Sequence, residues 1–138
     1  MMRTVLLFPF AVLYGLITLI RNILFDTGIL KSTSFDIPVI CIGNLSAGGT
    51  GKTPLTHYVV SLLNDKPLAI LSRGYGRRTT GFIKADNNST AVSIGDEPLT
   101  YFKSFSNKPV TVAVCEKRVA GINKLLQADD TLHAIVLD

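Results

Sequence analysis

The stretch Asn44-Leu45-Ser46-Ala47-Gly48-Gly49-Thr50-Gly51-Lys52-Thr53 decides how the chain folds around it. An apolar run over 37–42 precedes it, and a helix-compatible run over 55–63 follows it. Strand, glycine-rich turn, Gly-Lys-Thr and helix is the layout of a phosphate-binding loop, in which backbone N–H groups and a helix N-terminus surround phosphate oxygens. The sequence therefore predicts a nucleotide phosphate site, formed by Ser46, Ala47, Gly48, Gly49, Thr50, Gly51, Lys52 and Thr53.

Two side chains in this stretch have a chemistry that a purely structural turn does not need. Lys52 is placed to contact the β- and γ-phosphates, and Thr53 is placed to give its hydroxyl to Mg²⁺. One position departs from the pattern, because Ser46 stands where a glycine is expected, and the Gly48-Gly49 pair can supply the flexibility instead. The alternative interpretation, a glycine-rich turn before a helix, explains neither Lys52 nor Thr53.

Composition sets the limits of the fold. A chain of 138 residues with 47% hydrophobic and 17% charged residues can form one packed domain, which argues against disorder. The net charge of +4 is modest, and no basic stripe interleaved with aromatic residues indicates a nucleic-acid partner. Cys41 and Cys115 each lie within an apolar run, so we expect two buried thiols and no zinc site.

Strand and helix patterns alternate along the rest of the chain, which predicts an α/β fold with a parallel sheet and flanking helices. The run 38–43 is apolar without interruption, which predicts a strand buried on both faces. Helical patterns cover 99–105 and the segment after 116, and 91–94 is expected to pair with 82–85 as a short hairpin. The further strands of the sheet are expected at 67–71, 109–114 and 133–137.

A basic loop follows the strand at 67–71 and contains Arg73, Tyr75, Arg77 and Arg78. Ligands of open α/β sheets bind at the carboxyl ends of strands, and arginine suits phosphate or carboxylate groups. The loop is therefore a candidate site for an anionic ligand. A solvated basic turn is the alternative interpretation.

Three acidic residues are candidates for chemistry near the phosphates. Asp96 and Glu97 open the helical pattern, where they act either as caps favoured by the helix dipole or as groups near the γ-phosphate and Mg²⁺. Asp138 ends an apolar strand, which is where phosphate-loop proteins place an acid that holds Mg²⁺. Arg118 follows another strand, and both a phosphate contact and a surface charge fit it.

The N-terminal segment has no charged residue over 4–20, and the apolar pattern continues to Phe25. We expect a helix over 10–25 that lies in the membrane interface, since 17 residues are short for a span and about 20 are needed. A buried helix of the domain and a true transmembrane span are the alternatives. Pro9 fits a first helical turn or delays the start of the helix.

Taken together, these residues resemble the tetraacyldisaccharide 4'-kinase family, the lipid A 4'-kinases. The resemblance rests on VICIGNLSAGGTGKT at 39–53, LSRGYGR at 71–77, GDEPL at 95–99, the 116–118 region and IVLD at 135–138. Each motif alone is weak, but the combination is specific. Ser46 is shared by the family, so it ceases to be an anomaly.

The resemblance implies transfer of the γ-phosphoryl group of ATP to the 4'-hydroxyl of a tetraacyl glucosamine disaccharide 1-phosphate, forming lipid IVA. It implies Asp96 and Lys52 as catalytic residues, residues 46–53 as the ATP site, and Thr53, Glu97 and Asp138 as the Mg²⁺ site. The resemblance also implies a binding site for the anionic acceptor, formed by Arg73, Tyr75, Arg77 and Arg78.

Two segments follow from the resemblance: a membrane-associating helix at 1–27 and the N-terminal lobe of a P-loop kinase at 36–138. The helix implies a peripheral protein on the cytoplasmic face of the bacterial inner membrane. The family continues after Asp138 with Asp-Gly-x-Gln-His and a second lobe, so we expect this chain to be an N-terminal fragment. A MinD-like ATPase is one alternative, although Ala47 stands where that group has its signature lysine. A non-catalytic nucleotide-binding membrane module is the other.

Overall fold

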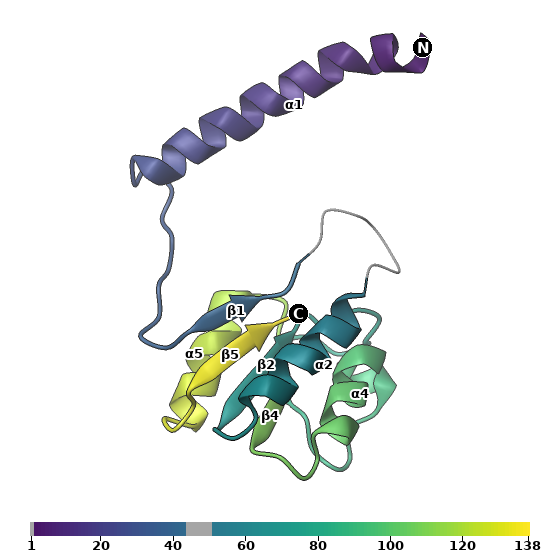
Figure 1. The fold of residues 1–138 in the computed structure, drawn as a ribbon, viewed down its shortest axis with the longest axis vertical. Coiled ribbons are helices and arrows are strands. Elements are labelled where there is room, and N and C mark those ends of the chain that lie inside the picture. The colour runs from purple at the N-terminus through teal and green to yellow at the C-terminus, as the bar shows by residue number, and fades with distance from the viewer. Residues whose placement is uncertain (1, 44–50) are drawn as a thin grey trace. The chain divides into compact units, whose positions relative to one another are not determined.

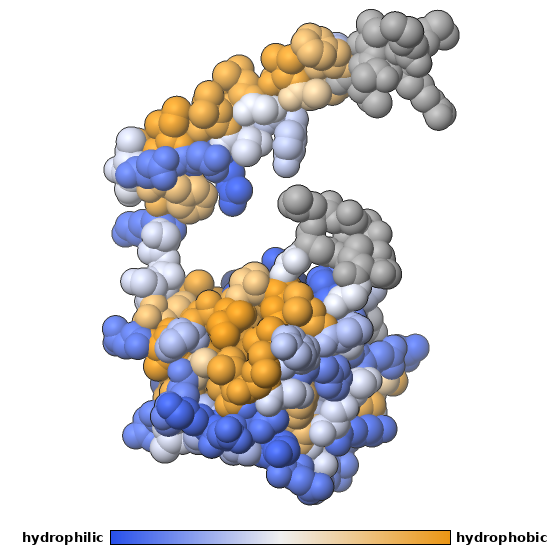
Figure 2. All heavy atoms as spheres, viewed as in Figure 1, coloured by the Kyte–Doolittle hydropathy of each residue, from blue (hydrophilic) through white to orange (hydrophobic). Residues whose placement is uncertain are grey.

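The structure, a computed structural model, describes residues 2–43 and 51–138, and it separates into one compact unit that ends at Ser34 and another from Phe35 to Asp138. The first unit is built on helix α1, Met2–Asp26. The helix begins earlier than expected, so Pro9 lies inside it. The segment Phe8–Asp26, with a mean hydropathy of 1.7, is long and apolar enough to cross a membrane, by length and composition. Apolar side chains cover much of its surface (Figure 2).

The second unit contains a sheet of five described strands in the order β1-β5-β2-β4-β3. Figure 1 labels the first four of these, β1, β5, β2 and β4. Four of them are parallel to one another, and β3 runs antiparallel to β4. This confirms the predicted parallel sheet, with one antiparallel strand at its edge. The strands are β1 Val39–Cys41, β2 Leu68–Ser72, β3 Ile83–Lys84, β4 Val110–Val114 and β5 Ala134–Leu137.

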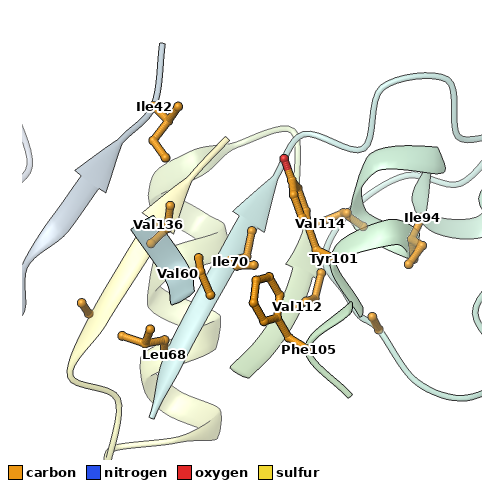
Figure 3. Close-up of a cluster of buried hydrophobic side chains, with 12 residues drawn as sticks. Ile42, Val60, Leu68, Ile70, Ile94, Tyr101, Phe105, Val112, Val114 and Val136 are labelled. Carbon is orange, nitrogen blue, oxygen red and sulfur yellow. The ribbon is translucent and has the colours of Figure 1, made fainter. Parts of the chain in front are cut away.

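Helices cover both faces of this sheet. One face packs against α2 and α4, through Val60, Tyr101 and Phe105 (Figure 3). The other packs against α5, through Ile122 and Leu125. Successive residues of β2 alternate between the two clusters because side chains of a strand point to opposite faces. The described helices of this unit are α2 Lys52–Leu63, α3 Ala91–Ile94, α4 Asp96–Ser104 and α5 Arg118–Ala128.

Three expectations about this unit are wrong. Residues 91–94 form α3 instead of a strand, because Thr90 and Ser93 make a reciprocal capping box that satisfies the first N–H groups of a helix. Strand β1 is not buried on both faces, and Cys41 is exposed while Cys115 is buried. The physical reason is position: β1 pairs with β5 on one side and stands at the edge of the described sheet.

Candidate active site

A cavity of about 890 Å³ opens at the edge of the sheet where the parallel strands β1, β2 and β5 end. Parallel strands bring their carboxyl ends to one edge, so segments far apart in sequence meet there. The described residues that line the cavity are Ile42, Gly43, Lys52, Ser72, Arg73, Tyr75, Asp96, Glu97, Arg118 and Asp138. Six of these were predicted as site residues from the sequence: Lys52, Arg73, Tyr75, Asp96, Glu97 and Asp138.

The start of α2 brings the end of the glycine-rich stretch to this cavity. Gly51 has φ 77° and ψ 18°, a left-handed conformation that favours glycine, and the helix begins at the next residue, Lys52. Lys52 therefore lies at a helix N-terminus, where unpaired N–H groups and the helix dipole favour an anion. The predicted phosphate contacts of Ser46, Ala47, Gly48, Gly49 and Thr50 lie outside the described residues.

The first turn of α4 faces the first turn of α2. The hydroxyl of Thr53 donates a hydrogen bond to Oε1 of Glu97, at 3.0 Å. Gly95, which precedes α4, has φ 94°, and an added Cβ there would lie 2.9 Å from the carbonyl oxygen of Tyr75. The backbone before Asp96 is thus packed closely against the loop that follows β2.

Asp138 follows β5, and its carboxylate accepts a hydrogen bond from a residue of the hydrophobic core. The hydroxyl of Tyr101 donates to Oδ2 of Asp138 at 2.9 Å. Burial raises the pKa of Asp138 above its ordinary value, and the negative charge of Glu97 raises it further. Burial likewise raises the pKa of Tyr101, so its hydroxyl stays protonated and remains a donor.

The loop after β2 divides its basic residues between the cavity and the body of the domain. Arg73 and Tyr75 line the cavity, and Tyr75 is 94% exposed. Arg77 does not line it: its side chain is 3% exposed and forms an ion pair with Glu116. Its Nη2 also donates to the carbonyl oxygen of Gly81 at 2.7 Å.

Arg78 is exposed and likewise lies outside the cavity lining. Its backbone N–H donates to the carbonyl oxygen of Val92. The described structure therefore brings Arg73 and Tyr75 to the cavity and leaves Arg77 and Arg78 away from it.

The sequence left open whether Arg118 contacts a phosphate or is a surface charge. In the structure, Arg118 lines the cavity. Its guanidinium donates to the carbonyl oxygen of Leu71 and to the main-chain oxygen of Asp138, so it joins the ends of β2 and β5. Burial, followed by the nearby charge of Arg73, lowers the pKa of Arg118. The sequence feature that indicates this location is the position of Arg118 shortly after β4, because that strand ends at the same edge of the sheet as β2.

The oxygen atoms at this cavity suit a hard divalent cation. Glu97 and Asp138 line the cavity with two carboxylates. The hydroxyl of Thr53 does not line the cavity but contacts Glu97. A hydroxyl and two carboxylates are a donor set that Mg²⁺ takes when it keeps several waters. The charge of Glu97 acts on Asp138, and a cation between the two carboxylates would relieve their repulsion. Among the described residues no cluster of three or more His, Cys, Asp or Glu side chains forms a protein-only metal cage.

Comparison with known proteins gives a consistent family. The profile of LpxK, tetraacyldisaccharide-1-P 4'-kinase, matches residues 3–138. The tetraacyldisaccharide 4'-kinase of Flavobacterium johnsoniae is 56% identical over 134 residues, which cover 96% of this chain and 39% of that protein. That of Cytophaga hutchinsonii is 49% identical over 135 residues, which cover 97% of this chain and 38% of that protein.

A solved structure agrees with these relatives. It is described as the apo form of LpxK from Aquifex aeolicus in complex with ATP, and it matches with a TM-score of 0.78 and 37% sequence identity. The match covers 99% of this chain and 44% of that one. The chain thus spans about two fifths of the length of the curated relatives given above.

Proposed function

This chain belongs to the tetraacyldisaccharide-1-P 4'-kinase family, LpxK, and from that premise we propose that it forms the ATP-binding part of a lipid kinase. The proposed reaction transfers the γ-phosphoryl group of ATP to the 4'-hydroxyl of a tetraacyl glucosamine disaccharide 1-phosphate. Its product is lipid IVA, an intermediate of lipid A biosynthesis. The observation that carries the proposal is the meeting of Lys52, Asp96 and Asp138, from three separate segments, at one cavity.

ATP is proposed to bind through residues 46–53. Lys52 supplies a positive charge at the N-terminus of α2, where it suits the β- and γ-phosphates. Arg118, which is half-buried and lines the same cavity, adds a further positive charge close to Arg73. The relative from Aquifex aeolicus, solved in complex with ATP, supports this assignment.

Mg²⁺ is proposed as the cofactor, held by Thr53, Glu97 and Asp138. When bound, it neutralises part of the charge on the β- and γ-phosphates. The chain's own contribution is to keep the three oxygen donors at one edge of the sheet. The contact between Thr53 and Glu97 and the effect of Glu97 on Asp138 support this arrangement.

Asp96 is proposed as the catalytic base. The acceptor's 4'-hydroxyl oxygen forms a bond to the γ-phosphorus, the bond from that phosphorus to the bridging oxygen breaks, and ADP leaves. The proton of the hydroxyl passes to Asp96, which lines the cavity as the first residue of α4. Glu97 is less suited to this task, because it accepts the hydrogen bond of Thr53.

The acceptor is proposed to bind near the loop after β2, at the membrane surface. Arg73 suits the anionic disaccharide, and the ring of Tyr75 offers a large exposed surface for a sugar. Arg77 and Arg78 would contribute less directly, since neither lines the cavity. Helix α1 would associate with the cytoplasmic face of the inner membrane, where a multiply acylated substrate resides.

A transfer assay tests the proposal. The chain, in mixed micelles with the tetraacyl disaccharide 1-phosphate, is incubated with Mg²⁺ and γ-labelled ATP, and the label is followed into lipid and into free phosphate. Lys52→Ala is the negative variant, and Lys66→Ala, which changes an exposed lysine after α2, is the matched control.

Labelled lipid with the wild type, lost with Lys52→Ala, would support the kinase. Free phosphate without labelled lipid would favour an ATPase. ATP binding without either product would reduce this stretch to a nucleotide-binding module, and the absence of nucleotide binding would refute the assignment of 46–53.

A further inference from the structure

Helices α2 and α4 contact each other in two successive turns, starting at their N-terminal ends beside the cavity. Thr53 and Glu97 make a polar contact in their first turns, at 3.0 Å. Four residues further along each helix, the rings of His57 and Tyr101 lie 5.1 Å apart at an interplanar angle of 55°. Because residues four apart lie on the same face of a helix, the second contact lies directly below the first. An aromatic layer therefore supports the polar layer that faces the cavity.

Of the two rings in this aromatic contact, that of Tyr101 carries a hydroxyl that reaches a residue lining the cavity, Asp138. The side chain of Tyr101 is completely buried, and its ring lies in the core cluster with Ile70 and Val112. Figure 3 shows its hydroxyl oxygen directed toward the end at which β2 and β5 finish. That hydroxyl donates to Oδ2 of Asp138 at 2.9 Å, so the contact joins α4 to the end of β5.

The packing around the ring leaves Tyr101 little freedom to move. His57, from α2, lies against it, and His57 also contacts the ring of Phe105 at 5.1 Å. The hydroxyl of Thr56, also on α2, is buried beside the Tyr101 hydroxyl. A hydroxyl carried on such a fixed ring fixes the rotation of the carboxylate that accepts its hydrogen bond.

Resting on the proposed function, we propose that Tyr101 is a positioning residue, whose hydroxyl orients the carboxylate of Asp138 for the Mg²⁺ that accompanies ATP. Groups that orient metal ligands without touching the metal commonly change metal affinity by about 10- to 100-fold when they are removed. Tyr101 and Glu97 stand one turn apart on α4. The same helix therefore provides one carboxylate to the cation directly and orients the other.

The substitution Tyr101→Phe separates orientation from packing, because it removes the hydroxyl and keeps the buried ring. Tyr58→Phe is the matched control, since it makes the same chemical change on α2 at a side chain that is 62% exposed. The full chain is studied in detergent micelles. ATP affinity is measured by calorimetry with Mg²⁺ and with EDTA, Mn²⁺ affinity without nucleotide is measured by electron paramagnetic resonance, and melting temperature is recorded.

For Tyr101→Phe we expect Mn²⁺ affinity, and the gain in ATP affinity that Mg²⁺ confers, to fall by about 10-fold or more. ATP affinity in EDTA should match that of the wild type and of Tyr58→Phe, and the melting temperature should fall by no more than the loss of one buried hydrogen bond explains.

Unchanged Mn²⁺ affinity and an unchanged effect of Mg²⁺ would overturn the inference. So would an equal loss of ATP affinity with and without Mg²⁺ together with a lower melting temperature, because that pattern describes a merely structural residue. If the wild type binds no ATP, the proposed function fails, and the Mn²⁺ titration still decides the role of Tyr101.

Discussion

At the scale of single residues, two roles are proposed for Asp96, and one substitution separates them. Asp96 is the first residue of α4, where a carboxylate favours the helix dipole, and it also lines the cavity. In a protein that spans the whole length of the curated relatives, we expect Asp96→Asn to lower turnover by about 10²- to 10⁴-fold, the usual contribution of a general base, with little change in ATP affinity. Steady-state kinetics and nucleotide binding measure the two quantities.

The matched control for Asp96 is Asp130→Asn, which changes an exposed acid after α5. If Asp96→Asn lowers the melting temperature and leaves turnover intact, Asp96 stabilises the first turn of α4 and is not a base.

Gly95 sets the distance between α4 and the loop after β2. It has φ 94°, and an added Cβ would lie 2.9 Å from the backbone oxygen of Tyr75. Gly76 has a comparable φ of 79° with nothing within 4 Å of its Cβ position, so it isolates the effect of the backbone conformation.

We expect Gly95→Ala to lower the free energy of unfolding by about 1–3 kcal/mol, and by more than Gly76→Ala. Urea unfolding followed by circular dichroism measures both variants. Equal losses would show that the close approach to Tyr75 has no energetic consequence.

At the scale of elements, Arg77 and Glu116 hold the loop after β2 to the end of β4. Glu116 accepts from Arg77 and, through Oε2, from the N–H of Gly81 at 3.1 Å. Hydrogen bonds from its own backbone N–H, from Arg77 and from Gly81 keep the pKa of Glu116 below its ordinary value. Its contribution to stability is therefore present above the ordinary pKa and is lost as the pH falls through the lowered one.

We expect Glu116→Gln to speed amide hydrogen exchange over 73–81 at neutral pH, because an amide makes a weaker partner for the guanidinium. The difference from the wild type should shrink as the pH falls below the pKa of Glu116. Asp130→Asn serves as the control. Exchange rates in Glu116→Gln equal to those of the wild type at neutral pH would show that the pair does not hold the loop.

Short elements were the hardest to predict at this scale. The strands β2, β4 and β5 were found from their apolar runs, since a strand inside a parallel sheet must be apolar on both faces. Residues 91–94 have an apolar pattern too short to distinguish a helix from a strand. The capping box between Thr90 and Ser93 stabilises the helical conformation.

At the scale of the whole molecule, the unit up to Ser34 and the unit from Phe35 are proposed to divide membrane association from nucleotide binding. We expect the full chain to float with vesicles of anionic and zwitterionic lipid, and a chain of residues 35–138 to stay in the soluble fraction. Far-UV circular dichroism of the shorter chain checks that it remains folded. Flotation of residues 35–138 would assign the membrane contact to the second unit.

The order of strand, glycine-rich turn and helix could be predicted from the residues alone, because a phosphate-binding loop has glycines, a lysine and a threonine in a fixed order, and Gly51, Lys52 and Thr53 follow that order. The sequence also indicated the family, the parallel sheet and the acids at strand and helix ends. That Arg73 lines the cavity while Arg77 pairs with Glu116 follows from how distant segments pack, since both arginines have the same local sequence pattern. Only the structure linked Tyr101 to Asp138, because that hydrogen bond joins residues that no sequence spacing relates.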